Sequence, residues 1–377
     1  MLKKINFNII YNLLFIAILL YPLAIIYKIS DFSVSYLFVL VIMLLAGVRF
    51  LYYINNLNSL YILSFYLIIL FIINFINIKF FFFMFTFILF IVIGFNYKMY
   101  FINKKVIKKF INFSFVISII GIILYFLKIP LFDFKIAGSE KYFMLSNGYY
   151  RAMSIFLNPN SFAYFIIFAF SLMLFYGKYI FFNKYYRKLY YIVFLFSLYI
   201  AYSRSAILSM VLILIVYGIY RFKISRKNKL LILFFMLIML ISFFMFLLSS
   251  RELFYNYDIR FLKIDIAIDY LTKNFYHFIF GYPHYINIKK NGISFSDNMF
   301  LYFFLRGGMI LFILISFIYL KAILKSIIII ILKRIEIGYA VYLFSSIPLM
   351  FFSNFILFFP NVILFAISIG VILKGYK

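Results

Sequence analysis

Long runs of apolar residues recur along the whole chain, separated by short polar stretches. In the run from Phe80 to Gly94, apolar residues occupy nearly every position and do not alternate with polar ones. Strands of membrane barrels alternate over segments of about 10 residues, whereas a membrane-spanning helix needs about 20 mostly apolar residues. The pattern therefore predicts helical membrane spans and excludes a β-barrel.

Charged and Asn/Pro-rich stretches divide the chain into about twelve spans of this kind. The spans lie near residues 8–26, 34–52, 60–77, 80–97, 110–127, 160–177, 189–203, 205–220, 230–248, 298–320, 338–353 and 356–373. The predicted fold class is all-α, a single polytopic helical membrane domain over residues 1–377 with one medium outer loop (about 128–160) and one large outer loop (about 249–297).

Composition and charge agree with this pattern. The chain is 68% hydrophobic and only 12% charged, which a soluble globular protein could not bury. Its net charge is +28, and most of the 37 Lys and Arg residues fall on alternate segments, with a single acid, Glu336, among them. Basic residues favour the cytoplasmic side, so both termini are predicted to be cytoplasmic. Orientation and anionic membrane lipids account for the charge, and no nucleic-acid partner is expected.

The two long outer segments concentrate the polar chemistry, including both histidines and most of the acids. The larger segment is predicted to hold an interfacial helix that extends to Tyr276, because Asp269 and Lys273 stand four residues apart with the acid first. Gly281 is expected to end that helix. In the following span, Gly307-Gly308 is expected to permit close helix packing.

Arginines supply the candidate anion-binding groups, because a guanidinium grips phosphate or carboxylate with two parallel hydrogen bonds. The outer face carries Arg151, Arg204, Arg251 and Arg260, whereas the inner clusters are mainly lysine. Arg204 stands between two spans with almost no loop, where a cation without a partner is costly. An Arg204 that only extends to lipid phosphates remains an alternative.

Polar residues next to the spans are the other candidates. Asn158 and Asn160 surround Pro159, which is expected to end one segment, and Asn160 or Ser161 is expected to cap the next helix, so capping alone could explain these residues. His284 and Asp297 are candidate general bases, because His titrates near neutral pH and burial can raise the pKa of Asp toward it. Asp297 and Asn298 could equally serve as a helix cap. The chain has no cysteine, and no metal-binding, P-loop or dinucleotide motif is found.

Four segments in this order resemble the O-antigen polymerase and O-antigen ligase superfamily of bacterial polysaccharide assembly. They are Arg151 with Asn158-Pro-Asn160, Tyr202-Ser-Arg-Ser-Ala206, Arg260 with Phe280-Gly-Tyr282, and Ser296-Asp-Asn298 with Arg306-Gly-Gly308. The likeness covers residues 145–315. Ligases carry His where this chain has Asp297-Asn298, which favours the polymerase branch, and Pro283 replaces the second glycine of the third motif.

The resemblance implies a glycosyltransferase that moves a growing glycan from undecaprenyl diphosphate to the next lipid-linked repeat unit, on the outer face of the bacterial cytoplasmic (inner) membrane. It implies neither a cofactor nor a metal. Arg151, Arg204, Arg260 and Arg251 would bind the diphosphate, and Asp297 or His284 would be catalytic, with Asn158, Asn160 and Asn298 in support. The product would be O-antigen, capsule or a related polysaccharide, and a chain-length regulator and a flippase would be partners.

Three other functions remain open at this stage. A ligase would transfer finished glycan with similar arginines. A lipid-linked oligosaccharide flippase could have the same number of spans, but charged residues would be expected along a path within them, where Arg306 is nearly alone. A channel would need rings of acids or carbonyls in the spans, which the sequence does not indicate.

Overall fold

The computed structural model describes residues 28–29, 32–33, 58–72, 78–128, 151–156, 158–222, 225–249, 269, 273–281, 299–352 and 360–374. Regular structure in these ranges is helical, apart from an antiparallel pair of two-residue strands, β1 (Lys28–Ile29) and β2 (Phe32–Ser33). The all-α prediction is confirmed for this part of the chain. The spans predicted near 8–26 and 34–52 lie outside the described residues.

The helices follow the predicted spans closely through the middle of the chain. Their bounds are α3 (Asn58–Ile72), α4 (Ile78–Asn96), α5 (Lys98–Phe101), α6 (Lys104–Leu127), α7 (Pro159–Ile180), α8 (Lys184–Ala201), α9 (Arg204–Arg221), α10 (Arg226–Ser249), α12 (Phe275–Phe280), α13 (Met299–Leu332), α14 (Ile337–Ser345), α15 (Ile347–Phe352) and α16 (Asn361–Leu373). Within the described ranges, α6, α7, α9 and α13 are long and apolar enough to cross a membrane. The chain is therefore a helical membrane protein, while the total of about twelve spans stays a prediction.

Several elements differ from the predicted bounds. Helices α6 and α8 begin earlier, at Lys104 and Lys184, and α5 lies wholly in a stretch predicted as an inner loop. Helix α13 continues to Leu332, through residues that the sequence predicts as the start of an inner loop. In this extension the Lys325 ammonium donates a hydrogen bond to the Leu373 carbonyl oxygen at 2.5 Å. The span predicted at 338–353 is divided into α14 and α15 at Ser346.

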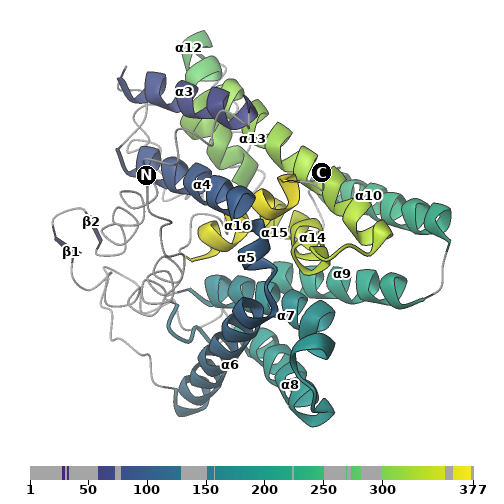
Figure 1. Cartoon of the computed structure of the whole chain (residues 1–377). Helices are drawn as coiled ribbons and strands as arrows, with labels where there is room; N and C mark the ends of the chain where they lie inside the picture. The colour runs from purple at the N-terminus through teal and green to yellow at the C-terminus, as the bar shows by residue number, and fades with distance from the viewer. Residues whose placement is uncertain are drawn as a thin grey trace, which may run out of the picture.

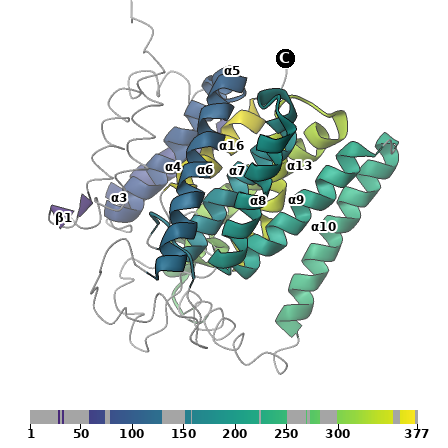
Figure 2. The same cartoon turned by 90° about the horizontal axis from the view of Figure 1, so that it is seen from below.

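Helix α7 is the centre of the packing, because most of its side chains are buried all around the helix. A helix that is apolar on every face is stable only when other helices surround it, and α6, α8, α9, α14 and α16 all contact it. Figure 2 shows α6 to α10 as a series of helices that runs from dark blue (α6) to green-teal (α10), with α10 at its edge. In Figure 1, α16 lies in the middle of the molecule between α4 and α14.

Glycine permits the close approach of α4 and α16. A Cβ atom on Gly370 would stand 2.6 Å from the Phe95 amide nitrogen, so no larger residue fits without a shift of the backbone. Small residues at helix contacts let backbones approach closely in membrane proteins. The short apolar helix α16 is thereby held deep in the bundle, with almost every side chain buried.

The predicted break at Gly281 and the predicted close packing at Gly307-Gly308 meet at one place. Helix α12 ends at Gly281 (φ +87°), which lies against the backbone of α13, and Gly308 (φ +68°) interrupts the helical backbone of α13. A Cβ atom on Gly308 would stand 2.5 Å from the Phe280 amide nitrogen. The Tyr66 hydroxyl donates to the Gly307 carbonyl oxygen at 2.8 Å, which joins α3 to the kink. Close packing at Gly307-Gly308 is confirmed. Gly281 ends a helix as predicted, but that helix is α12, which begins at Phe275 after the Asn274 cap, and not the predicted interfacial helix up to Tyr276.

Candidate functional site

Arg151 lies at a junction where one helix ends and others begin. Its Nε atom donates to the Ala201 carbonyl oxygen at 3.0 Å, and its Nη2 atom donates to the Tyr202 carbonyl oxygen at 3.1 Å. These carbonyls belong to the last residue of α8 and to its left-handed C-cap. Carbonyls at a helix C-terminus lack intrahelical partners and attract cations. The guanidinium therefore has a structural anchor that holds it in place.

The start of α7 supplies the second side of this junction. The Asn158 side chain accepts a hydrogen bond from the Asn160 amide at 2.8 Å and so caps the helix at Pro159. The Asn160 Oδ1 atom in turn accepts a hydrogen bond from Arg151 Nη2 at 2.8 Å. The cap was predicted at Asn160 or Ser161, with Pro159 ending the preceding segment. The cap is instead Asn158, because Pro159 fits in the first turn of the helix, where its missing N–H is not needed. Asn160 connects the helix start to the arginine.

The start of α9 supplies the third side. Arg204 is the first residue of this helix and is exposed, and Ser203 before it is buried. The Tyr164 hydroxyl of α7 stands 3.1 Å from the Ser205 hydroxyl of α9, so a buried hydrogen bond ties the two helix starts together. We call this region, formed by the end of α8 and the starts of α7, α9 and α16, the Arg151 junction.

Helix α16 joins the junction from the far end of the chain. Its first residue, Asn361, is fully buried and donates from Nδ2 to the Ser161 carbonyl oxygen in the first turn of α7 at 3.1 Å. The N-termini of α7 and α9 thus lie beside Arg151, and that of α16 lies against the first turn of α7. Each helix N-terminus carries a partial positive charge. No local signal pointed to Asn361, because it lies outside the four motifs and its partner is distant along the chain.

The electrostatics of the Arg151 junction favour an anion. Burial lowers the pKa of Arg151, nearby Tyr164 raises it, and the positive charge of Arg204 lowers it. Arg151 keeps its charge nonetheless, since arginine keeps its proton in proteins. Among the described residues, no Asp or Glu forms an ion pair with Arg151 or Arg204. These two neighbouring arginines beside the N-termini of α7 and α9 are chemically suited to hold a phosphate or a carboxylate.

Five of the residues predicted for the site lie outside the described residues. They are Arg251, Arg260, His284, Asp297 and Asn298. The predicted pair of Asp269 and Lys273 is present, with Lys273 Nζ and Asp269 Oδ2 2.5 Å apart on an exposed helical turn. The structure thus brings together Arg151, Arg204, Asn158 and Asn160. In the described ranges, no group of three or more His, Asp or Glu residues could hold a metal ion.

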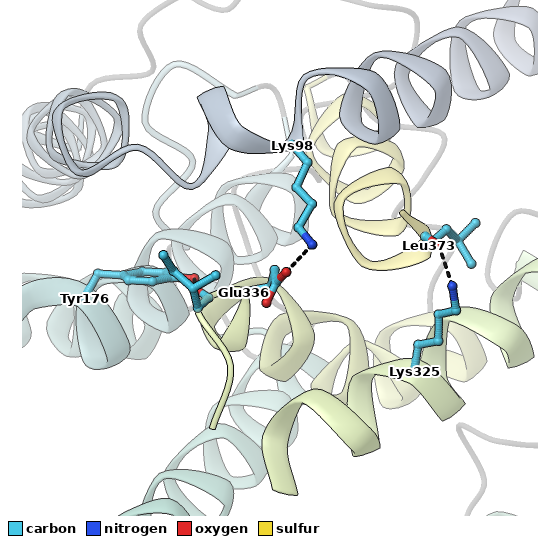
Figure 3. Close-up of polar contacts among 6 residues, drawn as sticks. Lys98, Tyr176, Lys325, Glu336 and Leu373 are labelled. Atoms are coloured by element: carbon cyan, nitrogen blue, oxygen red, sulfur yellow. Dashed lines mark hydrogen bonds and ion pairs between the residues drawn. The ribbon is translucent and has the colours of Figure 1, made fainter. Parts of the chain in front are cut away.

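A second polar cluster lies at the opposite end of α7. Lys98 forms an ion pair with Glu336, and both side chains are buried. Tyr176, near the end of α7, donates to the Ile335 carbonyl oxygen at 2.5 Å. Figure 3 shows Lys98 and Glu336 pointing toward each other from separate elements, with Lys325 and Leu373 nearby. We call these residues the Glu336 cluster.

The two clusters are separated by a distance that fits a bilayer. Helix α7 has 22 residues, and at 1.5 Å per residue it is about 33 Å long, close to the thickness of about 30 Å of a bilayer's hydrocarbon core. The Arg151 junction belongs to segments predicted on the outer side, and the Glu336 cluster to segments predicted on the inner side. The sequence did not predict the pairing of Glu336 with Lys98, because both residues lie in segments that it indicates as inner loops.

Comparison with known proteins adds no relative. The chain matches no family model, no curated protein and no solved structure.

Proposed function

We propose that the protein is a polymerase of lipid-linked oligosaccharide repeat units, a glycosyltransferase that transfers a growing glycan from undecaprenyl diphosphate to the next lipid-linked unit. The observation that supports this best is the Arg151 junction, where two arginines lie beside the N-termini of α7 and α9 and pair with no acid among the described residues. The four motifs and their order are the second support.

Transfer of the glycan mainly requires groups that stabilise the leaving diphosphate, and the Arg151 junction offers such groups. The donor glycan is already activated, because the carrier diphosphate is the leaving group when its bond to the sugar breaks. Negative charge then develops on the diphosphate oxygen, and fixed donors aimed at that oxygen lower the barrier. Arg151 is suited to this task, because its hydrogen bonds to Ala201, Tyr202 and Asn160 hold the guanidinium in place. A proton must also leave the acceptor hydroxyl, and Asp297 or His284 is proposed as its base.

The partners and location follow from the same proposal. The substrate is an undecaprenyl-diphosphate-linked oligosaccharide that reaches the Arg151 junction from the outer leaflet of the bacterial cytoplasmic membrane. We propose that the Glu336 cluster faces the cytoplasm, because it gathers the lysines of the predicted inner segments. A flippase or a chain-length regulator would act beside this protein.

A ligase and a flippase are the competing proposals. A flippase must open alternately to both sides of the membrane. Buried contacts tie the helices at the Glu336 cluster, including the ion pair of Lys98 and Glu336 and the bond from Tyr176 to Ile335. Those contacts favour a site reached from one side. Against a ligase stands Asp297-Asn298, where ligases carry His.

Deletion of the gene distinguishes these functions by what accumulates. A polymerase defect leaves surface glycan of a single repeat unit, or single units on the carrier where the pathway has no ligase. A ligase defect instead leaves full-length polymer on the carrier. A flippase defect removes surface glycan and traps units on the inner leaflet.

Complementation of the deletion then tests the arginine. Arg204 and Arg221 are the first and last residues of the same helix, α9. We expect Arg204→Gln to lower the rate of elongation at least tenfold, because a donor to the leaving phosphate is lost. Arg221→Gln is the matched control and should elongate normally. Normal chain length with Arg204→Gln, at equal membrane abundance, would contradict the assignment.

A further inference from the structure

The helix starts of the Arg151 junction each carry a buried oxygen atom without a hydrogen-bond partner among the described residues. They are Ser161 Oγ in the first turn of α7, Ser203 Oγ immediately before α9, and Asn361 Oδ1 at the first residue of α16. These residues are 2%, 2% and 0% exposed. Buried polar atoms are nearly always paired in folded proteins, so the two unpaired serine hydroxyls, which can donate, indicate that a ligand completes the site.

Helix α9 also begins without a side-chain cap. Ser203 is its N-cap residue, but the hydroxyl accepts no hydrogen bond from the first turn. The first intrahelical bond runs from the Ile207 amide to the Ser203 carbonyl oxygen, at 2.9 Å. The amides before Ile207 therefore lack intrahelical acceptors. Helix α16 likewise begins after Pro360 without a side-chain cap.

The balance of donors and acceptors identifies the chemical class of the ligand. Two serine hydroxyls, the free amides of α9 and the guanidiniums of Arg151 and Arg204 can all donate. Against these donors stands one unpaired carbonyl acceptor, Asn361 Oδ1. A ligand with several acceptor oxygens and negative charge fits this set, and a phosphate group has both properties.

We propose that Ser203 and the first-turn amides of α9, beside Ser161 and the start of α16, bind a phosphate group of a polyprenyl diphosphate. This inference rests on the proposed function for the identity of the lipid. It assigns the binding of phosphate to the helix starts as well as to the arginines. It also adds α16, which lies outside the four motifs.

Binding and stability can be separated with two alanine variants. The Ser203 hydroxyl makes no hydrogen bond to the part of the chain that the structure describes, so Ser203→Ala should leave the unfolding temperature unchanged. We expect it to weaken binding of geranylgeranyl diphosphate and of inorganic pyrophosphate three- to tenfold. The matched control is Asn183→Ala at the start of α8, where the side chain accepts from the Tyr185 amide at 2.8 Å. That variant should lower the unfolding temperature and leave binding unchanged.

A third variant, Ser203→Asp, should weaken phosphate binding more than Ser203→Ala does. Ser203→Asp supplies a good N-cap and places a negative charge where the phosphate would lie, so it should abolish binding of both probes without loss of stability. Purified full-length protein in detergent is suitable for all of these measurements. Wild-type protein that binds neither probe, or a Ser203→Asp variant that binds both as tightly as wild type, would overturn the inference.

The outcome is distinguishable from failure of the proposed function. If Ser203→Asp abolishes binding but gene deletion leaves glycan length unchanged, the phosphate site stands and the polymerase proposal is wrong. If deletion stops elongation but Ser203→Asp binds both probes and elongates normally, the polymerase proposal stands and the inference is wrong.

Discussion

The buried ion pair of Lys98 and Glu336 gives the most quantitative prediction. Both side chains are almost fully buried, at 5% and 1% exposure, and they connect α5 to the start of α14. Removing one partner leaves an uncompensated charge in a medium of low dielectric constant. Such single changes cost about 3–5 kcal/mol, whereas replacing both partners with apolar residues is often neutral or stabilising. We therefore expect Lys98→Met and Glu336→Leu each to destabilise the protein by about 3–5 kcal/mol.

The double variant completes a double-mutant cycle with these two single variants and is the decisive measurement. Lys98→Met with Glu336→Leu should recover most of the stability that either single change loses, because no unpaired charge remains. The assay is reversible unfolding of purified protein in mixed detergent, followed by circular dichroism. The exposed pair of Asp269 and Lys273 is the matched control, and Lys273→Ala there should cost no more than about 0.5 kcal/mol. Single changes at Lys98 and Glu336 below about 1 kcal/mol, or losses that simply add in the double variant, would refute the reasoning.

Two further predictions concern the fold and its orientation. Gly308→Ala should destabilise the protein by at least about 1–3 kcal/mol, because its backbone conformation is one that only glycine adopts readily. The control is Gly218→Ala on α9, where a Cβ atom meets nothing closer than 3.9 Å and the change should be neutral or stabilising. Equal losses of stability for the two variants in a thermal unfolding assay would contradict the account. The chain has no cysteine, so Leu127→Cys and Phe182→Cys introduce single thiols at exposed positions beside the predicted outer and inner loops. A maleimide that cannot cross membranes should label position 127 in intact cells and position 182 only after permeabilisation, and the reverse pattern would invert the predicted topology.

Local signals in the sequence predicted much of the structure. The polar residues around Pro159 indicated a helix start, because capping side chains and proline act within a few residues, although the cap is Asn158 and not the predicted Asn160 or Ser161. Gly281 was recognised as a helix break for the same local reason. Gly308 was expected only to permit close packing, and the kink that it makes in α13 was not predicted.

Contacts between distant segments could not be predicted in this way. Glu336 is one acid among inner lysines in the sequence, and only packing of α14 against α5 and its neighbours selects Lys98 as its partner. The bond from Lys325 to Leu373, at the end of another helix, likewise joins segments that are distant along the chain. Asn361 joins the Arg151 junction only because α16 is inserted beside α7. Apolar periodicity carries no information about which helices become neighbours.

The polymerase proposal is tested most directly with purified protein in vesicles supplied with undecaprenyl-diphosphate-linked repeat units. The account predicts that longer glycans appear on the carrier as a ladder, with release of undecaprenyl diphosphate and without any nucleotide sugar. Vesicles with Arg204→Gln protein should form the ladder at least tenfold more slowly, and those with Arg221→Gln protein at the normal rate. Repeat units that stay single, whether or not they cross the bilayer, would contradict the central claim.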